Sequence, residues 1–383
     1  MKIILFANTD WYLYNFRLAL AKRLRDEGWD VVLVSPPGEY GLKLRALGYR
    51  WISVPFSTRS ANPLHELSLF KKLFNLYRQE RPQIVHHFTI KCVLYGSLAA
   101  KLVGGIKIVN AVTGLGHIFT DAGLKAKLLR PFVKGLYRLA LGGDGVRTVF
   151  QNSEDRDTFL NWGLVAKEQT ILIRGSGVDV DGFRNKGEGG RVKGEGKIVK
   201  LLFASRLLRE KGVFELLEAF KALREGGHDS ELLIAGDLYP ENPSSLSDED
   251  IKSFESIKGI TYLGHFDDMR SLLSDCDVVV LPSYAEGTPR ILIEAAAMEL
   301  PIVATDIAGC RGLIMDGVNG FLVPVKSVEP LADALQKLIV DCDLRQRMGR
   351  AGRQIVLAGF DQQNVNTKTV DVYRELIPVV RDA

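Results

Sequence analysis

Four charged side chains in the second half of the chain could do chemistry: the cations Arg206 and Lys211 suit a diphosphate, and the carboxylates Glu286 and Glu294 suit the hydroxyls of a sugar. Arg206 and Lys211 follow the apolar run LLFA, which is typical of a buried strand, so both cations belong to the rim at the end of that strand. An arginine can bind two phosphate oxygens at once, whereas a lysine acts as a compact positive charge. The alternative is that the two are solvated surface cations.

The carboxylates Glu286 and Glu294 stand on either side of a Thr-Pro step in the segment SYAEGTPRILIEAAAMELP. Thr288 is a good N-cap and Pro289 suits the first helical position, which predicts a helix of about three turns that stops before Pro301. The start of a helix offers unpaired N–H groups and a partial positive charge. Together with the two cations, it could hold a diphosphate without a metal.

The two carboxylates do not have the arrangement of a glycosidase pair, because one precedes a helix and the other lies on it. They are suited instead to accept the vicinal hydroxyls of a ribose or a sugar. The alternative makes Glu286 a partner of the helix dipole and Glu294 a solvated residue, but the apolar run AAAMEL after Glu294 indicates a buried helix, where a carboxylate needs a partner. Asp341 and Asp343 follow a late helix and are predicted to form a solvated turn, so no metal cofactor is expected.

Composition is that of an ordinary globular protein of 383 residues, a length that usually means two domains. The net charge of +4 is unevenly spread: residues 1–180 hold 25 Lys and Arg against 14 Asp and Glu, and the remainder holds 25 against 32. This asymmetry indicates that the first half meets an anionic surface or substrate. Four scattered cysteines without a CxxC pair, and the lack of a signal-peptide layout or a long apolar segment, predict a cytoplasmic protein.

Strand-like and helix-like segments alternate along the whole chain, with one interruption. KIILFAN, DVVLVSP, QIVHHF, KIVNAVT and TVFQNS read as strands of a first domain, and IVKLLFAS, ELLIAGD, ITYLGHF, DVVVLPS and PIVATD as strands of a second. Between them, the Gly-rich charged segment 185–197 reads as a linker or an exposed turn. The alternation predicts an α/β fold with two doubly wound parallel sheets, whose ligands bind at the carboxyl ends of the strands.

These residues resemble glycosyltransferase family 4, whose members are retaining enzymes of the GT-B fold that use nucleotide sugars. Glu286 and Glu294 match the family's Glu-x7-Glu pair, PIVATDIAGCRGLIMDGVNGFLVP matches its next signature, and SRLLREKG matches its Arg-x4-Lys phosphate clamp. In the first half, YNFRLALAKRL, HHFTIKCVLYGSLAAKLVG and VTGLGHIFT are similar to a branch that builds bacterial surface polysaccharides and lipid-linked glycans. At Gly312 the chain departs from the family, which usually has Glu there, and no role is assigned to that position.

The resemblance implies roles for the residues that match. Glu286, with the backbone that follows it, would hold the donor sugar and its phosphate, and His117 matches a position where many relatives carry a histidine facing the donor sugar, although close branch members often have tyrosine. These two are the predicted catalytic residues. The predicted donor-binding residues are Arg206, Lys211, Gly287, Thr288, Pro289 and Glu294.

The resemblance also implies a domain plan and an activity. Residues 1–184 would form an acceptor-binding Rossmann-like domain, 198–360 a nucleotide-sugar-binding domain facing it across a cleft, and 361–383 a helix that crosses back to the first domain. The implied reaction moves a hexosyl or N-acetylhexosaminyl group from a nucleotide diphosphate sugar, a UDP-sugar by preference, to a lipid-linked or polysaccharide acceptor. A nucleotide-sugar epimerase and a non-catalytic sugar-nucleotide-binding protein are the alternatives.

The stretch GLKAKLLRPFVKGLYRLALGG, residues 123–143, carries five basic residues and no acidic one. It is either a solvated basic helix or a face that contacts an anionic membrane surface, and the positive first half favours the membrane. Nucleic acid is not an expected partner, because no recognition module appears. His86 and His87 end a strand, where they either contact an acceptor or are structural.

Overall fold

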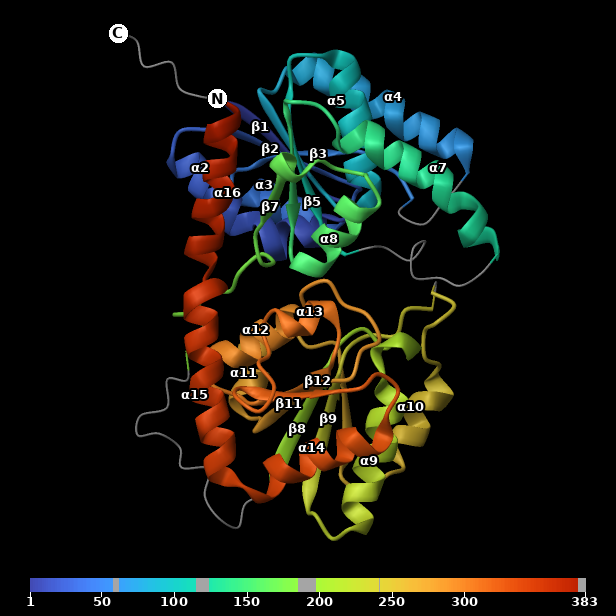
Figure 1. The fold of residues 1–383 in the computed structure, drawn as a ribbon, viewed down its shortest axis with the longest axis vertical. Coiled ribbons are helices and arrows are strands. Elements are labelled where there is room, and N and C mark those ends of the chain that lie inside the picture. Colours follow the sequence, from blue (N-terminus) through green and yellow to red (C-terminus); the bar gives the residue numbers. More distant parts are fainter. Residues whose placement is uncertain (58–61, 115–123, 185–197, 241, 378–383) are drawn as a thin grey trace. The chain divides into compact units, whose positions relative to one another are not determined.

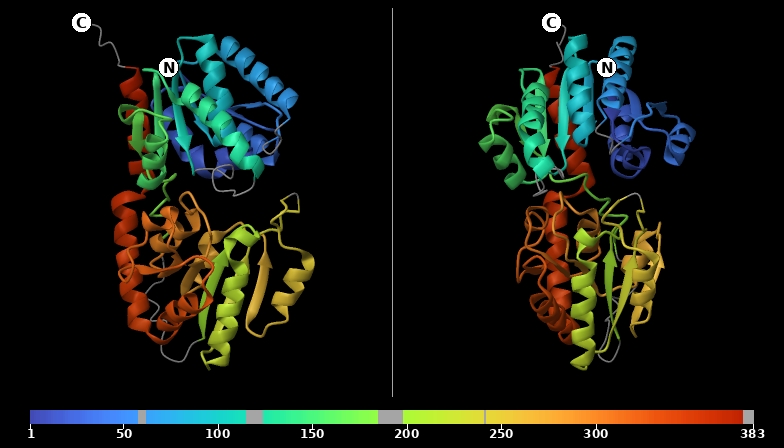
Figure 2. Two further views of the ribbon diagram at one scale, coloured as in Figure 1. Left: turned by 45° about the vertical axis from the view of Figure 1, so that its right-hand side comes forward. Right: turned by 90° about the vertical axis from the view of Figure 1, so that its right-hand side faces the viewer.

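The computed structural model describes residues 1–57, 62–114, 124–184, 198–240 and 242–377, with the side chains of 124–128 left out. The chain divides into two compact units, residues 1–176 with 363–383 and residues 177–362. Each unit is a parallel sheet with helices on both of its faces (Figures 1 and 2), which confirms the prediction of two Rossmann-like α/β units. The predicted linker 185–197 lies outside the described residues.

The first unit is built on a parallel sheet in the order β3-β2-β1-β4-β5-β6-β7. Its central strand β1 pairs with β2 and β4 and sends alternate side chains to opposite faces, so that Ile3 and Leu5 join one core cluster and Ile4 and Phe6 the other. The described strands are β1 (Lys2–Phe6), β2 (Asp30–Ser35), β3 (Arg50–Ser53), β4 (Ile84–Phe88), β5 (Lys107–Val112), β6 (Val146–Phe150) and β7 (Thr170–Leu172).

The helical segment between β1 and β2 is not one continuous α-helix. A π-helical segment, η1, separates its short beginning α1 from the remainder α2, and a second such segment, η2, precedes α5. The described helices of this unit are α1 (Asp10–Tyr12), η1 (Leu13–Arg17), α2 (Leu18–Asp26), α3 (Glu39–Ala46), α4 (Pro63–Glu80), η2 (Cys92–Gly96), α5 (Ser97–Val103), α7 (Leu124–Leu141), α8 (Ser153–Asn161), the 3-10 turn η3 (Lys167–Gln169) and α16 (Gln362–Leu376).

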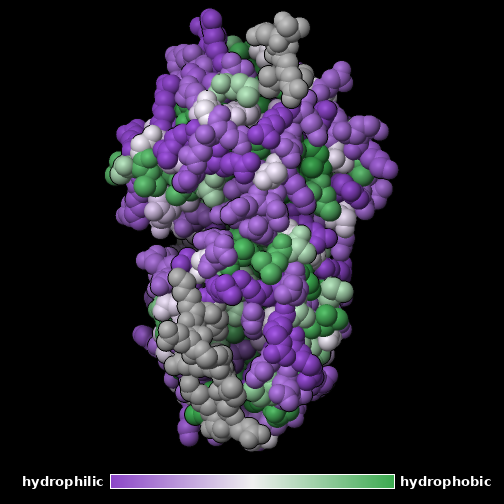
Figure 3. All heavy atoms as spheres, turned by 90° about the vertical axis from the view of Figure 1, so that its left-hand side faces the viewer, coloured by the Kyte–Doolittle hydropathy of each residue, from purple (hydrophilic) through white to green (hydrophobic). Residues whose placement is uncertain are grey.

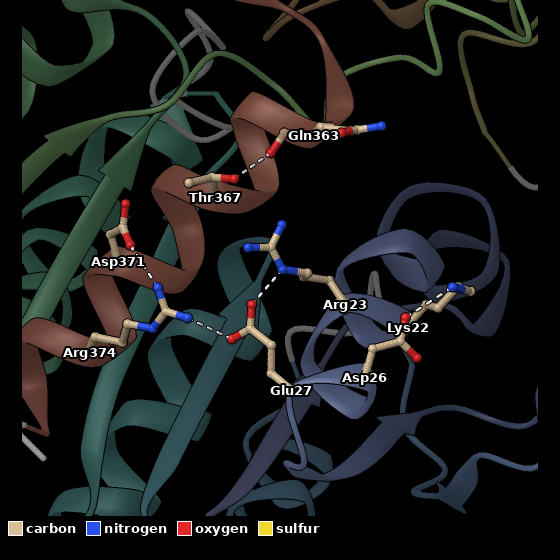
Figure 4. Close-up of polar contacts among 8 residues, drawn as sticks. All are labelled: Lys22, Arg23, Asp26, Glu27, Gln363, Thr367, Asp371 and Arg374. Atoms are coloured by element: carbon tan, nitrogen blue, oxygen red, sulfur yellow. Dashed lines mark hydrogen bonds and ion pairs between the residues drawn. The ribbon is translucent and has the colours of Figure 1, made fainter.

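The last helix, α16, packs on the first unit although it follows the whole second unit in sequence. Tyr373 is fully buried, and its hydroxyl lies 2.5 Å from Nδ1 of His86 in β4. On the surface, Arg374 pairs with Glu27 at 2.9 Å (Figure 4), and Glu27 also pairs with Arg23 of α2. Apolar burial therefore carries the docking of α16, and exposed ion pairs such as these add little to it.

The second unit has a parallel sheet in the order β10-β9-β8-β11-β12-β13 and one large core cluster that surrounds it. Its central strand β11 is buried along its whole length, as the apolar run VVVL predicts. The described strands are β8 (Val199–Ala204), β9 (Ser230–Ala235), β10 (Ile260–Gly264), β11 (Val278–Leu281), β12 (Ile302–Thr305) and β13 (Gly320–Val323).

The second unit contains one long helix that the sequence pattern did not predict. Asp341, expected in a solvated turn, is the N-cap of this helix, and its Oδ1 accepts a hydrogen bond of 2.8 Å from the N–H of Leu344. The described helices are the 3-10 turn η4 (Arg209–Lys211), α9 (Val213–Glu225), α10 (Asp248–Glu255), α11 (Met269–Ser274), α12 (Arg290–Ala297), α13 (Ala308–Arg311), α14 (Val328–Val340) and the unpredicted α15 (Cys342–Gly359). No described helix is both long and apolar enough to cross a membrane.

Candidate active site

The strand order of the second unit reverses between β8 and β11, which are neighbours in the sheet. From β8 the chain continues to β9 on one side, and from β11 it continues to β12 on the other. In open α/β sheets, ligands bind outside the carboxyl ends of the strands at such a switch point. The segments that follow these two strands, 205–212 and 282–290, contain most of the side chains predicted to bind the donor.

Lys211 is brought to the loop after β11 by the glycine that follows it. Gly212 has a left-handed backbone with φ +72°, and a Cβ at this position would lie 2.1 Å from the carbonyl oxygen of Pro282. The N–H of Tyr284 also donates to the carbonyl of Glu210 at 2.9 Å. Only glycine allows so close an approach of the two backbones, so the turn η4 and the loop are held together.

At this contact the ammonium of Lys211 pairs with the carboxylate of Glu286, with Nζ and Oε1 separated by 2.6 Å. Lys211 is only 7% exposed. Because both charges are largely removed from water, each depends on the other for compensation. The sequence placed these two residues at ends of separate strands, and the structure shows that they are direct partners.

Arg206 lies on the same rim but has a different environment. It is exposed, and its guanidinium stands 5.8 Å from the ring centre of Tyr239. A Cβ at Gly236, which follows β9, would lie 1.8 Å from the carbonyl oxygen of Ser205, so glycine is again required where the two strand ends approach each other. Arg206 is therefore a solvent-exposed cation at the rim of the sheet, whereas Lys211 is a buried one.

The helix α12 begins one residue later than predicted. Thr288 is not its N-cap: Pro289 occupies the cap position in an extended conformation (ψ 115°), its carbonyl accepts from the N–H of Leu292 at 3.2 Å, and no side chain caps the helix. The helix is also shorter than three turns, since it ends at Ala297. Gly287, Thr288 and Pro289 lead directly into its positively polarised end.

The segment before α12 is tightly covered by α13. A Cβ at Gly309 would lie 2.3 Å from the carbonyl oxygen of Gly287 and 2.5 Å from that of Glu286. Burial raises the pKa of the neighbouring Cys310 thiol, and the Glu286 charge adds to this effect. The close approach of Gly309 thus fixes the backbone that carries Glu286. The sequence alone does not predict this role, because Gly309 lies more than 20 residues from Glu286 in the chain.

Glu294 lies on α12 and is 6% exposed. Its Oε1 accepts a hydrogen bond of 2.6 Å from Nε of Arg290, one turn earlier, which confirms that a buried carboxylate here needs a partner. Burial raises the pKa of Glu294, although the positive charges of Arg290 and Arg270 oppose the shift. The carboxylate is therefore oriented by Arg290.

Three further residues of this region, Tyr284, Glu215 and Lys326, were not indicated by the sequence. The hydroxyl of Tyr284 donates to Oε1 of Glu215 in α9 at 2.6 Å, and Nζ of Lys326 lies 4.9 Å from the centre of the Tyr284 ring. Burial and the Glu215 carboxylate raise the pKa of Tyr284. The tyrosine therefore joins the loop after β11 to η4 through its backbone N–H and to α9 through its side chain.

Of the three histidines considered in the first unit, the structure describes His86 and His87 but not His117. His86 and His87 are both buried in β4, and burial lowers the pKa of each, that of His87 to about 4. In the described part of the chain, no three His, Cys, Asp or Glu side chains come together in a group that could hold a metal ion.

The second unit is doubly wound and carries a buried cation and a helix N-terminus at its switch point. That arrangement is typical of nucleotide- or phosphate-binding proteins. Residues 191–355 match the family model of glycosyl transferases group 1, and residues 2–153 match that of glycosyl transferase 4-like proteins, so that together the two models cover most of the chain. The chain belongs to this family of glycosyltransferases, and its fold is GT-B.

Similar proteins extend over nearly the same length. The chain is 29% identical to N,N'-diacetylbacillosaminyl-diphospho-undecaprenol alpha-1,3-N-acetylgalactosaminyltransferase of Campylobacter jejuni, with 98% of this chain and 99% of that protein covered. It is 26% identical to UDP-Gal:alpha-D-GlcNAc-diphosphoundecaprenol alpha-1,3-galactosyltransferase of Escherichia coli, with 85% and 83% covered. The crystal structure of HepE from Anabaena in complex with UDP superposes with a TM-score of 0.77 at 18% identity, over 98% of this chain and all of that one.

Proposed function

We propose that the protein is a retaining glycosyltransferase that moves a hexosyl or N-acetylhexosaminyl group from a UDP-sugar to a lipid-linked or polysaccharide acceptor in bacterial cell-surface glycan synthesis. The observation that carries the proposal is the buried Lys211–Glu286 pair, which faces the switch point beside the uncapped start of α12. The names of the Campylobacter and Escherichia relatives support it, because both describe transfer to a diphospho-undecaprenol-linked sugar and one names UDP-Gal as donor.

In the proposed reaction the bond between the anomeric carbon and the β-phosphate oxygen breaks, and a bond from an acceptor hydroxyl oxygen to that carbon forms on the same face. The electron pair of the broken bond stays on the leaving diphosphate, which also takes the acceptor's proton. Lys211, Arg206 and the N-terminus of α12 stabilise the negative charge that develops there. Because these three supply positive charge, the proposal requires no metal.

The carboxylates have separate roles in this scheme. Glu286 orients the ammonium of Lys211 at 2.6 Å and, with the backbone of Gly287, Thr288 and Pro289, holds the donor sugar and its phosphate. Glu294, held by Arg290, accepts hydrogen bonds from the ribose hydroxyls. His117 is proposed to face the donor sugar from the first unit.

The acceptor proposal places the protein at the inner face of an anionic membrane. Leu129, Phe132 and Leu139 are exposed on α7 at spacings that put them on one side of the helix, and the described basic residues of α7 include Lys134 and Arg138. An exposed apolar side on a helix that also carries basic residues suits a membrane interface. By contrast, the face of the molecule in Figure 3 is mainly hydrophilic, with hydrophobic residues in small groups.

The test is a panel of UDP- and GDP-sugars, screened first for thermal stabilisation and then incubated with lipid-linked sugar acceptors. Stabilisation by a UDP-sugar and release of UDP that depends on the acceptor are expected, since a ligand that favours the native state raises its melting temperature. Conversion of the sugar nucleotide without UDP release would show an epimerase instead. Binding without either reaction would show a non-catalytic sugar-nucleotide-binding protein.

A further inference from the structure

The first unit has a switch point of its own, where the strand order reverses between β1 and β4. Both strands lead into π-helical segments: η1 follows β1 after a short α1, and η2 begins four residues after β4. Single π-helical turns are rare and frequently mark functional sites. Two of them at the same switch point make this edge of the sheet a candidate for ligand binding.

The residue directly after β4 adds backbone strain at this edge. Thr89 has φ +73°, a left-handed conformation that is an outlier for a β-branched residue. The surroundings hold it there, because its carbonyl accepts from the N–H of Val93 at 2.9 Å. Strained residues of this kind cluster at ligand sites.

Arg17, the last residue of η1, is a buried cation at the same edge. Its guanidinium lies 4.3 Å from the ring centre of Phe88, the last residue of β4, and one nitrogen donates to the hydroxyl of Tyr12 at 2.8 Å. The side chain is only 5% exposed, and its Nε is buried without a hydrogen-bond acceptor. Among the described residues, no carboxylate pairs with it.

The neighbouring side chains do not provide the missing negative charge. The hydroxyl of Tyr373 lies within hydrogen-bond distance of His86 Nδ1, and burial together with the charge of Arg17 lowers the pKa of His86. A buried cation without a counter-charge is costly in a folded protein. Aromatic rings compensate it only in part, so an anion supplied from outside would complete the site.

We propose that Arg17 binds a phosphate of the acceptor's diphosphate group at the switch point of the first unit. This assignment rests on the proposed function, since it assumes a diphosphate-linked acceptor. The guanidinium is already oriented, because it stacks on Phe88 and is hydrogen-bonded to Tyr12. Binding a phosphate therefore forms charge-assisted hydrogen bonds at little cost in side-chain conformational entropy.

The experiment measures binding by isothermal titration calorimetry with three probes: farnesyl diphosphate, farnesol and inorganic pyrophosphate. All proteins carry Lys211→Ala, which removes the buried cation of the donor site. The test variant is Arg17→Met, which keeps an unbranched apolar stem. The matched control is Arg25→Met, because Arg25 is an exposed arginine that also stacks on an aromatic ring, 4.3 Å from the centre of Tyr49.

We expect Arg17→Met to weaken farnesyl diphosphate binding at least ten-fold, Arg25→Met to leave it unchanged, and farnesol to bind none of the proteins measurably. Pyrophosphate binding as tight as that of farnesyl diphosphate would show that the anion alone suffices, whereas much weaker binding would show that the lipid contributes. Farnesyl diphosphate affinity in Arg17→Met within two-fold of the control would overturn the proposal. So would undetectable binding by the control itself.

A second readout separates a binding role from a structural one. If Arg17 serves a ligand, the ligand-free Arg17→Met protein should melt at the same temperature as its parent or higher, because an uncompensated buried charge has been removed. A clearly lower melting temperature would show that Arg17 supports the fold instead. Arg17→Lys keeps the charge without the planar fork and should bind with intermediate affinity. UDP-sugar binding to wild-type protein, measured separately, tests the proposed function independently of this site.

Discussion

At the scale of single residues, the ion pair between Lys211 and Glu286 fixes the positions of the two charges in the candidate site. Both side chains are largely buried, and their 2.6 Å contact makes the position of each depend on the other. Replacing one partner leaves the other as an uncompensated buried charge, which costs more than the pair itself contributes. Changes at the two positions should therefore not be additive.

Lys211→Met should lower the rate of sugar transfer by about 100- to 1,000-fold, the usual effect of removing one fixed donor from a site where negative charge develops. Glu286→Gln should have an effect of similar size. In the double variant the rate should fall by less than the product of the two single fold-decreases, because no buried charge is left unpaired. Initial rates of UDP release in the presence of acceptor measure this, with Lys221→Met, an exposed lysine on α9, as control. Wild-type rates in folded Lys211→Met protein would contradict the assigned site.

The sequence indicates the charged residues of the site but not the contacts that arrange them. Arg206 and Lys211 are indicated by the strand that they follow, because parallel strands end at a common edge, and Glu286 by the predicted helix start beside it. Tyr284 and its bond to Glu215 join segments 69 residues apart, and no local pattern predicts such a contact. The same holds for the glycines 212 and 309, whose small size matters only against a backbone distant in sequence.

At the scale of elements, the strands named from the sequence are found in the two sheets, but α3 and α15, two helices that contain close-packed glycines, were not predicted. In α3, a Cβ at Gly41 would lie 2.3 Å from the ring of Trp51, and in α15 one at Gly349 would lie 1.9 Å from the carbonyl oxygen of Glu299. Glycine lowers intrinsic helix propensity, so the sequence argues against a helix. Tertiary packing stabilises the two helices in spite of this propensity, because only glycine lets them approach their neighbours so closely.

Gly349→Ala should therefore destabilise the protein even though alanine favours helices. The added methyl group would collide with the backbone at Glu299 and push α15 away from the end of α12, at a cost of about 1–3 kcal/mol, the typical range for overpacking. Gly312→Ala is the matched control, since a Cβ there meets nothing within 4 Å. Urea unfolding followed by circular dichroism measures both variants. Equal stability of the two would show that α15 is not packed as described.

The exposed side of α7 makes a second prediction at this scale. The double variant Phe132→Ser, Leu139→Ser should reduce binding to vesicles that contain anionic lipid by at least ten-fold, because burying each apolar side chain contributes about 1.5–3 kcal/mol. Val340→Ser removes an exposed apolar side chain from α14 and should have no effect. Co-sedimentation with anionic and with neutral vesicles measures the difference. Undiminished binding by the double variant would assign the membrane contact to another surface.

At the scale of the whole molecule, charge and tryptophan residues are unevenly distributed along the chain. The first half is basic and the remainder acidic, and all four tryptophans, at positions 11, 29, 51 and 162, lie in the first unit. Tryptophan fluorescence therefore reports the unfolding of the first unit, whereas circular dichroism reports both units. The two signals allow a change in one unit to be assigned without separating it from the other.

The first unit should lose stability in mild acid because of His87. In the folded protein burial lowers its pKa to about 4, while in the unfolded chain the pKa is about 6.5. Above pH 6.5 the histidine is neutral in both states and has no effect. As the pH falls through 6.5 only the unfolded state takes up the proton, so the free energy of unfolding decreases, by about 2 kcal/mol between pH 7 and pH 5, and the loss levels off below pH 4. Buried His86, whose pKa is also lowered, adds to the same trend.

Urea unfolding followed by tryptophan fluorescence at pH 7 and pH 5 measures this loss. His87→Gln should reduce the difference between the two pH values, because the side chain no longer titrates, even if the variant is less stable at pH 7 through its lost contacts with Tyr77 and Asn110. His65→Gln changes an exposed histidine of the same unit and should leave the difference unchanged. The comparison uses the change with pH rather than stability itself, so loss of packing in His87→Gln does not obscure it. A full pH response in that variant would show that His87 is not the group responsible.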